Sequence, residues 1–293
     1  MRHGALAAFT ALLLAGCTSQ GHHPASPPPL SNLGVSAEST SAAAVPRFAH
    51  VVVVIEENHA YSQVIGNSNA PYINSLARSG TLLTDAHAVT HPSEPNYLAL
   101  FSGSTHGLGD DSCPHTYRGN NLGHQVRVHG MSFAAYSDSL PTTGFRGCSF
   151  GAYARKHAPW TNFTDLPGSV AKPMSAFPSD YAKLPRLAFV VPNLNHDMHD
   201  GTVAQADGWL RSHLAGYATW ARRHDSLLIV TWDENDDAAG NHIPGILVGA
   251  HVRRLHYAGS VDHYRMLATL EAAFRLPSLG LAARRSPISG VWN

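Results

Sequence analysis

Short apolar runs alternate with amphipathic segments along most of the chain. From Phe48 onward the apolar runs are rich in β-branched residues, as in strands that are buried on both faces. The segments between them carry apolar residues at helical spacing. The pattern predicts strands at residues 50–58, 81–89, 131–140, 184–193, 226–235 and 243–252, and helices at residues 70–80, 95–103, 208–224 and 264–276.

The beginning of the chain has the composition of an export signal followed by a tether. Residues 1–17 combine a basic start, an apolar run too short to span a membrane, and the sequence Leu-Ala-Gly-Cys. That sequence resembles a bacterial lipobox with Cys17 as the lipid acceptor; an ordinary signal peptide is the alternative. Residues 18–47 are rich in Ser, Pro, Ala and Gly and predict a linker. We therefore expect a domain at residues 48–293 that is exported and is either anchored to the cell envelope by lipid or secreted.

The alternation of strands and helices predicts an α/β fold with a mostly parallel central sheet and helices on both faces. Residues 104–175 do not follow this rhythm and are rich in Gly, Asn, Ser and aromatic residues. We expect them to form an irregular excursion that supplies one wall of a site. Cys113 and Cys148 lie in this segment. In an exported protein such a pair favours a disulfide over two free thiols.

Composition narrows the classes of function. The chain is 44% hydrophobic and 14% charged, which is enough apolar material for a sizeable core. The formal net charge of zero at pH 7 argues against nucleic-acid binding through a basic surface. The chain contains 20 His, and exposed imidazoles become cationic below about pH 6. This property suits an anionic substrate in an acidic setting, although compositional drift in a high-GC genome is an alternative explanation.

Polar clusters follow three of the predicted strands. They contain Glu56, Glu57, Asn58 and His59 after the first strand, Asn193, Asn195, His196, Asp197, His199 and Asp200 after the fourth, and Asp233, Glu234, Asn235, Asp236 and Asp237 after the fifth. Ligands of open α/β sheets bind outside the carboxyl ends of the strands, so we expect these clusters to converge. Converged carboxylates repel one another unless they are protonated or neutralised by a cation. Oxygen ligands favour Mg²⁺, Ca²⁺ or Mn²⁺, and added imidazoles admit Zn²⁺ or Fe. Taken alone, the first cluster is also compatible with a polar loop or a helix cap, and the third with a solvated acidic turn. The alternating His and Asp residues of the second are harder to explain as a plain loop.

The corner between the strand at 81–89 and the helix that follows it has the composition of a nucleophile site. Thr90 stands where the strand ends, and the start of the next helix favours an anion through its free N–H groups and its dipole. A cation beside the hydroxyl would lower the pKa of Thr90, and Asn96 or nearby amides would hold phosphoryl oxygens. Ser93 is the competing nucleophile. A simple helix cap at Thr90 with Pro92 in the first turn is compatible with both readings.

Eight motifs, in order, resemble one known family. They are ENHAYSQVIG, APYINSLA, THPSEPNYLALFSGST, DDSCPHT, YARKHAPW, VPNLNHDMHDG, LLIVTWDEND and NHIPGILVGA, and they run from about His50 to the C-terminus. The chain resembles the bacterial phosphoesterase family of secreted acid phosphatases and non-specific phospholipases C, within the alkaline-phosphatase-like superfamily. This resemblance implies a three-layer α/β/α sandwich. The form with THPSEPNY is most similar to the acid phosphatase branch, which includes enzymes active on phosphoinositides such as phosphatidylinositol 3-phosphate.

The resemblance also implies roles for individual residues. It places metal ligands at Glu57, Asn58, Asp233 and Glu234, and it maps the nucleophile onto Thr90. It also implies catalytic roles for His157, Asp197, His199 and His242, and we expect Asn96 at the corner to act with them. Contacts with the substrate are expected from His59, His91, Ser93, Arg155 and Lys156. One divalent ion is as compatible with this ligand set as two.

Three functions are compatible with these observations. The first is an exported phosphatase that hydrolyses phosphate monoesters, including a phospholipid headgroup, by a metal-assisted nucleophilic mechanism and that touches a membrane only through its lipid anchor. The second is a phosphodiesterase of the phospholipase C type. The third is a lipid-tethered surface protein that binds metal or phosphate without turnover.

Overall fold

The computed structural model describes residues 44–237 and 239–293. The expected signal peptide at residues 1–17, its Cys17, and nearly all of the expected linker at residues 18–47 lie outside the described part. Val45 is already buried in the core, and the Arg275 side chain donates to its carbonyl oxygen at 3.0 Å. In the described part, no helix is long and apolar enough to span a bilayer.

A nine-stranded sheet forms the centre of the fold, in the order β10-β2-β9-β8-β1-β7-β3-β6, with β11 also paired to β2. Its strands are β1 (His50–Glu56), β2 (Thr81–His87), β3 (Phe133–Ser137), β6 (Ala171–Pro173), β7 (Leu187–Val191), β8 (Ser226–Trp232), β9 (His242–Gly249), β10 (Leu255–Tyr257) and β11 (Val261–Asp262). A separate small hairpin consists of β4 (Ser149–Phe150) and β5 (Tyr153–Ala154).

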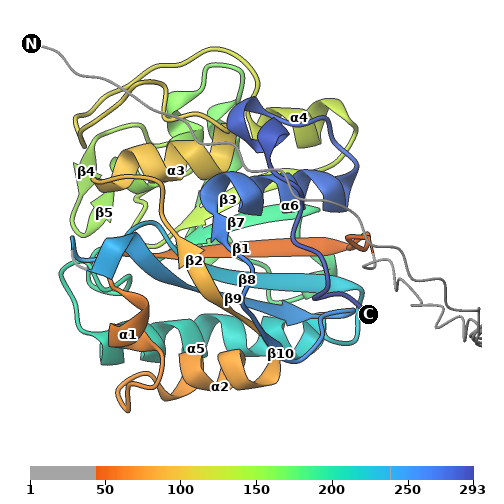
Figure 1. Ribbon diagram of the computed structural model, residues 1–293. Coiled ribbons are helices and arrows are strands. Elements are labelled where there is room, and N and C mark those ends of the chain that lie inside the picture. Colours follow the sequence, from red (N-terminus) through yellow and green to blue (C-terminus); the bar gives the residue numbers. More distant parts are fainter. Residues whose placement is uncertain (1–43, 238) are drawn as a thin grey trace, which may run out of the picture. The chain divides into compact units, whose positions relative to one another are not determined.

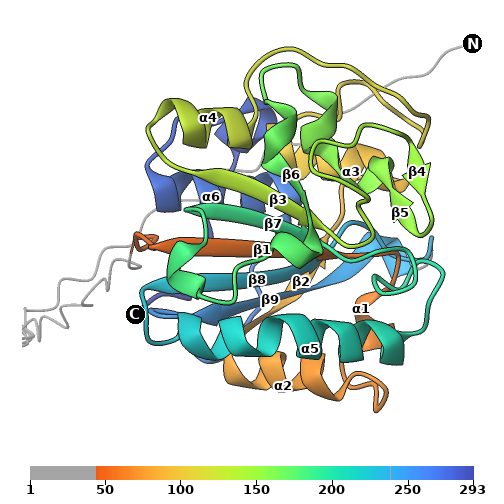
Figure 2. The same ribbon diagram turned by 180° about the vertical axis from the view of Figure 1, so that it is seen from behind.

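Helices pack on both faces of the sheet, as Figures 1 and 2 show. One face carries α1 (Tyr61–Val64), α2 (Pro71–Ser79) and α5 (Val203–Ala221), and the other carries α3 (Ser93–Ser102), α4 (Leu122–Val128) and α6 (His263–Phe274). Short 3₁₀ turns are η1 (Arg155–His157), η2 (Pro159–Asn162), η3 (Gly168–Val170), η4 (Met174–Ala176), η5 (Tyr181–Lys183), η6 (Ala239–Asn241) and η7 (Gly280–Arg284). The expected three-layer α/β/α sandwich is therefore confirmed.

Strand β1 lies in the middle of the core. Val51, Val52, Val53 and Val54 are each 0% exposed, because helices cover both faces of the sheet. The strand pairs in parallel with β7 on one side and β8 on the other. Branched side chains suit this position, since they pack on a pleated surface and lose little rotamer freedom there.

The pairings confirm a mostly parallel sheet with one reversed strand. Among the described strands of the central sheet, β9 is the one that runs antiparallel to its neighbours, β2 and β8. The long excursion at residues 104–175 is as irregular as expected and contains α4, short strands and 3₁₀ turns. Helix α5 begins earlier than the predicted residue 208, because Thr202 and Gln205 form a capping box at its start.

Candidate active site

The ends of three neighbouring strands bring the polar clusters together. Because β1 lies between β7 and β8, the segments that follow these strands meet at one edge of the sheet. The backbone N–H of Glu57 donates to the carbonyl of Asp197 at 2.8 Å, and that of Asp233 donates to the carbonyl of Glu56 at 3.1 Å. The convergence expected from the sequence is thus present, and backbone hydrogen bonds fix it.

Glu57 is the centre of a buried group of polar side chains. Its Oε1 atom accepts a hydrogen bond from the Tyr97 hydroxyl at 2.6 Å and lies 3.0 Å from Nε2 of His157. The other ring nitrogen of His157 lies 3.4 Å from Oδ2 of Asp197. Neither of these His157 contacts is aligned as a hydrogen bond. The ligand atoms of Glu57, His157 and Asp197 all lie within 4.8 Å of one another, so the three side chains can share a metal ion.

Ser93 lies between two carboxylates. Its hydroxyl oxygen is 3.1 Å from Oε2 of Glu57 and 3.0 Å from Oε1 of Glu234. The residue is 1% exposed and is the first residue of α3. His91 lies on the outer side of Glu234, where its Nδ1 atom is 2.7 Å from Oε2.

A tight backbone turn after β1 places Asn58 beside Asp233. Asn58 has φ of 58°, in the left-handed region that Asn tolerates better than most residues. Its N–H donates to Oδ1 of Asp233 at 3.2 Å. The Asp233 carbonyl in turn faces Nε2 of the buried His263 at 2.6 Å. The predicted metal ligands Glu57, Asn58, Asp233 and Glu234 therefore lie in one continuous network.

The structure places the side chains of Thr90 and Asn96 in different surroundings from that of Ser93. Asn96 is 0% exposed, and its amide accepts from the N–H groups of Val89 and Thr90 and donates to the carbonyls of Thr90 and Pro92. These four bonds use its capacity, so Asn96 holds the corner in shape in place of the expected contact with phosphoryl oxygens. The Thr90 hydroxyl donates to the neighbouring carbonyl at 3.1 Å and makes no described contact with the carboxylates.

Lys156 forms the cationic side of the site. Its Nζ atom is 2.8 Å from Oδ2 of Asp111 and 3.3 Å from Nε2 of His199. The backbone N–H of His199 donates to Oδ1 of Asp197 at 2.8 Å, and the ring Nδ1 atom of His199 lies 2.7 Å from Oδ1 of Asp200. These contacts connect Lys156 and His199 to the buried group around Glu57.

Burial and mutual repulsion act strongly on the ionisable groups. Burial, reinforced by Asp233 and Asp197, raises the pKa of Glu57 well above its usual value. Burial and the neighbouring Glu234 do the same to the pKa of Asp233, and burial raises the pKa of Asp197 to about 7. Converged carboxylates of this kind need protons or a cation near neutral pH.

The side chains present fit a divalent metal ion. Burial, with a smaller effect of Lys156, lowers the pKa of His157 well below its usual value, which leaves the imidazole neutral and able to act as a ligand. The carboxylates supply oxygen ligands. The Nε2 atom of His157, whose contact with Glu57 is not aligned as a hydrogen bond, remains available to bind a cation. The donor set admits Mg²⁺, Ca²⁺ or Mn²⁺ through oxygen and Zn²⁺ or Fe through the imidazole.

Three of the expected site residues form no described hydrogen bond with the carboxylates around Ser93. The His242 ring stacks between Tyr61 and His87, with centroid distances of 4.6 Å and 5.0 Å, and its Nε2 atom faces the Thr84 carbonyl. These contacts place His242 in an aromatic stack beside β2, outside the carboxylate group. His59 lines a surface hollow with Gln63, Asn67 and Val203, at the residue next to Asn58.

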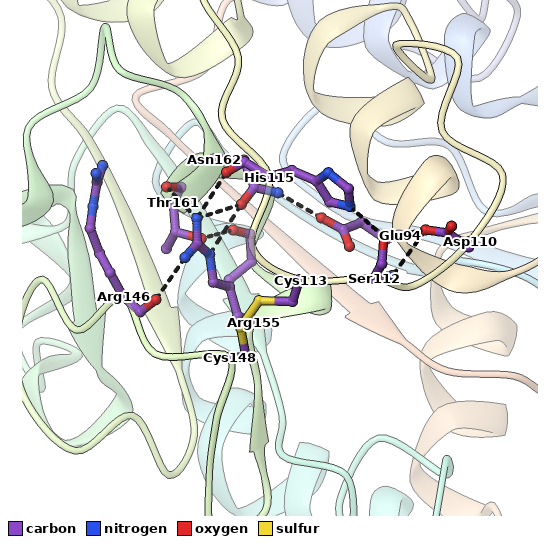
Figure 3. The surroundings of a disulfide bond; sticks show 11 residues. Glu94, Asp110, Ser112, Cys113, His115, Arg146, Cys148, Arg155, Thr161 and Asn162 are labelled. Atoms are coloured by element: carbon purple, nitrogen blue, oxygen red, sulfur yellow. Dashed lines mark hydrogen bonds between the residues drawn. A yellow bond between two sulfur atoms is a disulfide. The ribbon is translucent and has the colours of Figure 1, made fainter.

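Arg155 is the third, and it lies in the wall behind the site. Its guanidinium donates to the carbonyls of Arg146 and His115 and to the Asn162 side chain. The residue is 6% exposed, so these bonds give it a structural role in place of the expected contact with an anion. Figure 3 shows this network beside the Cys113–Cys148 disulfide, which confirms the expected pairing.

Two residues of the site escaped the sequence analysis. Tyr97 follows the corner by one helical turn, and its apolar surroundings identify it as a core residue without revealing the contact of its hydroxyl with Glu57. Asp111 lies in the irregular excursion, where no periodicity indicates which way a side chain points. The motif DDSCPHT was the one available signal for Asp111.

Comparison with known proteins shows similarity over most of the chain. The model of the Phosphoesterase family matches residues 67–277. The chain is 48% identical over 258 residues to the phosphatidylinositol-3-phosphatase of Mycobacterium tuberculosis, with 86% of each chain covered. It is 32% identical over 282 residues to a probable acid phosphatase of Kluyveromyces lactis, covering 86% of this chain and 66% of that one.

Solved structures share the fold at low sequence identity. A phosphonate monoester hydrolase of Agrobacterium radiobacter superposes with a TM-score of 0.55 and 13% identity, covering 84% of this chain and 79% of that one. A protein of the alkaline phosphatase superfamily from Vibrio parahaemolyticus gives a TM-score of 0.54 and 12% identity, covering 80% and 69%. The matched family model and the relatives together show that this chain belongs to the Phosphoesterase family.

Proposed function

We propose that this protein is a metal-dependent phosphatase that hydrolyses phosphate monoesters with Ser93 as the nucleophile. The observation that carries the proposal is the position of the Ser93 hydroxyl at the first residue of α3, within 3.1 Å of Glu57 and 3.0 Å of Glu234. The dipole at the start of a helix favours a bound phosphoryl group. Family membership supports the hydrolysis of phosphate esters.

Ser93 is a better candidate than Thr90 on geometric grounds. An alcohol becomes a useful nucleophile when a base or a metal lies beside it. Ser93 has two carboxylates in hydrogen-bonding range, so one of them is placed to accept its proton. The Thr90 hydroxyl, in contrast, has one described hydrogen bond, to the carbonyl of the next residue. We therefore assign the attack on phosphorus to Ser93 Oγ.

The proposed metal ligands are Glu57, Asn58, Asp233 and Glu234, and His157 and Asp197 extend the set if a second ion binds. When bound, a divalent ion supplies charge neutralisation at the phosphoryl oxygens and lowers the pKa of a bound hydroxyl. Without it, the carboxylates would repel an incoming phosphate dianion as well as one another.

The Lys156 ammonium and the imidazoles of His199 and His91 are proposed to bind the phosphate. The Lys156 ammonium and His199 lie side by side and are connected to Asp197 through the His199 N–H. His91 lies at the outer edge of Glu234, where it can contact a bound ester. His59 follows Asn58 in the chain and lines a surface hollow with Gln63, and we assign the alcohol part of the substrate to this hollow.

We propose phosphorylated small molecules and phospholipid headgroups as substrates. The relative from Mycobacterium tuberculosis is named for phosphatidylinositol 3-phosphate, which makes a phosphoinositide a suitable first lipid to test. Export through the segment at residues 1–17, with Cys17 as a lipid anchor or with release after cleavage, would place the enzyme outside the cytoplasm.

Phosphate release from p-nitrophenyl phosphate between about pH 4 and 9 tests the proposal. The purified protein is assayed before and after EDTA treatment, with Mg²⁺, Ca²⁺, Mn²⁺, Zn²⁺ and Fe²⁺ returned one at a time. We expect activity that is lost on chelation and restored by at least one ion. Activity on bis(p-nitrophenyl) phosphate alone would indicate the phosphodiesterase instead. Phosphate binding without hydrolysis of either ester would indicate the non-catalytic binding protein.

A further inference from the structure

Helix α3, which carries Ser93, takes its cap from a distant loop. The residue before the helix is Pro92, whose side chain forms no capping hydrogen bond. The N–H groups of a first helical turn need acceptors from outside the helix. Oδ1 of Asp111 accepts from the Glu94 N–H at 2.9 Å and so satisfies one of them. An aspartate in the irregular excursion thus caps the helix in place of a residue that is close in sequence.

The second oxygen of the same carboxylate holds Lys156. Oδ2 of Asp111 lies 2.8 Å from Nζ of Lys156, and the two side chains are 26% and 19% exposed. The ammonium also lies 3.3 Å from Nε2 of His199, whose Nδ1 atom faces Asp200. Since Nδ1 faces a carboxylate, it carries the ring proton, and Nε2 is left to accept from Lys156. Asp111 and His199 together therefore fix two of the directions in which the ammonium can donate.

The chain holds both partners of this ion pair in place. Asp111 lies two residues before Cys113, and the disulfide connects Cys113 to Cys148. The Cys148 carbonyl accepts from the N–H of Arg155 at 3.0 Å, and Arg155 precedes Lys156. Figure 3 shows that the guanidinium of Arg155 continues this connection through Asn162 to Glu94 of α3.

We propose that Asp111 is a positioning residue for phosphate binding: it holds the Lys156 ammonium in line with the start of α3, so that the cation and Ser93 face the same phosphoryl group. This role rests on the proposed function of the site. It is separate from a general structural role, because it acts through Lys156. A charge-assisted hydrogen bond, such as that between Asp111 and Lys156, is stronger than a hydrogen bond between neutral groups.

A charge-matched pair of variants separates the two contacts of Asp111. In Asp111→Asn the Oδ1 atom remains to cap α3, whereas an NH₂ group faces Lys156 in place of the carboxylate. Asp110→Asn is the control, since it makes the same change one residue away, where Asp110 bonds to Ser112. We expect Asp111→Asn to raise the KM for p-nitrophenyl phosphate and the Kd for inorganic phosphate by about 10- to 100-fold, the range for loss of a hydrogen bond to a charged group. Asp110→Asn should stay within about twofold of the unsubstituted protein, since surface substitutions change little.

Combination with Lys156→Met shows whether Asp111 acts through Lys156. If it does, adding Asp111→Asn to Lys156→Met should change the KM and the phosphate Kd by less than about twofold, because contacting residues are not additive. An equal loss in both backgrounds, or values for Asp111→Asn that match those of Asp110→Asn, would overturn the proposal. Thermal unfolding of every variant shows whether the cap of α3 has been kept.

Isothermal titration with inorganic phosphate, at a fixed concentration of one divalent ion, keeps this test independent of turnover. Weaker phosphate binding in Asp111→Asn, in a protein that hydrolyses no ester, would support the positioning role and reject the proposed phosphatase. Normal hydrolysis and unchanged phosphate binding in Asp111→Asn would reject the positioning role alone.

Discussion

The hydroxyl of Ser93 lies 3.0 Å from Oε1 of Glu234, and this contact joins the start of α3 to the segment after β8. The two residues are 141 positions apart in the chain. Glu234 lies beside Asp233, whose raised pKa reflects burial and the repulsion between the two carboxylates. A hydroxyl in this setting is held next to groups that need a cation, which is the arrangement required for an activated nucleophile.

Replacing Ser93 by Ala should abolish turnover with little effect on folding. We expect kcat for p-nitrophenyl phosphate to fall by about 10³-fold or more, as for other lost nucleophiles. Thr90→Ala is the matched control, because it removes a hydroxyl three residues away whose described bond is to a neighbouring carbonyl. It should retain kcat within about tenfold, since it removes at most one ordinary hydrogen bond. The reverse order of effects would return the nucleophile to Thr90.

The Tyr97 hydroxyl should strengthen metal binding through Glu57. It donates to Oε1 at 2.6 Å, and its ring stacks on His157 at 5.2 Å. Groups that orient metal ligands typically contribute about 10- to 100-fold in affinity. Tyr97→Phe keeps the ring and removes only the donor, so we expect it to raise the concentration of metal ion needed for half-maximal activity after EDTA treatment by at least about tenfold.

Tyr153→Phe is the control for this measurement. Its hydroxyl is buried and, within the described part of the chain, has no hydrogen-bond partner. Removal of an unpaired buried hydroxyl should leave the metal requirement unchanged and should not lower stability. If Tyr97→Phe and Tyr153→Phe showed the same metal requirement, the Tyr97 hydroxyl would have no role in holding the ion.

The central sheet could be predicted from the sequence because burial on both faces leaves a direct pattern. The runs that became β1, β7 and β8 are short, apolar and rich in branched residues, and their ends carry the acidic clusters. The parallel order of these strands then brings the clusters together. The reversed direction of β9 leaves no such mark, because a strand buried on both faces has the same pattern in either direction.

The corner illustrates where prediction from sequence stops. Thr90 and Ser93 are both hydroxyl residues at a strand-to-helix junction, and residue type alone does not show which hydroxyl points toward the carboxylates. That direction depends on Asn96, which ties the backbone of the corner with four hydrogen bonds. The contacts of Asp111 could not be predicted for a related reason, since its partners Glu94 and Lys156 are 17 and 45 residues away in the chain.

Loss of the disulfide should affect stability and activity together. Cys113 and Cys148 close a loop with a sequence separation of 35 residues. By the chain-entropy model a loop of this length stabilises the folded state by about 3–4 kcal/mol. We expect Cys113→Ser/Cys148→Ser to lose about this much free energy of unfolding in urea and to show a raised KM, because Asp111 and Arg155 adjoin the two cysteines. A reducing agent should have no effect on this variant. A free energy of unfolding equal to that of the unsubstituted protein would show that the disulfide does not stabilise the fold.

Glu271 should make stability depend on pH far from the candidate site. It lies in α6, is 2% exposed, and accepts a hydrogen bond from the Leu279 N–H at 2.7 Å. Burial raises its pKa from 4.5 to about 7. The folded state therefore binds this proton more tightly than the unfolded state does. Its favourable contribution is complete below pH 4.5 and is lost as the pH rises through about 7.

Glu271→Gln mimics the protonated carboxyl at every pH and keeps an oxygen for Leu279. We expect the Tm of the variant to match that of the unsubstituted protein near pH 5 and to exceed it near pH 8. At the higher pH the glutamate of the unsubstituted protein carries a buried negative charge in the folded state, which the variant lacks. A gain of about 1 kcal/mol corresponds to about 2–4 °C for a domain of this size. The measurement is the difference between the two Tm values across this pH range, because effects of pH on the metal site are common to both proteins and cancel. A difference that stays constant with pH would show that Glu271 has no raised pKa in the folded state.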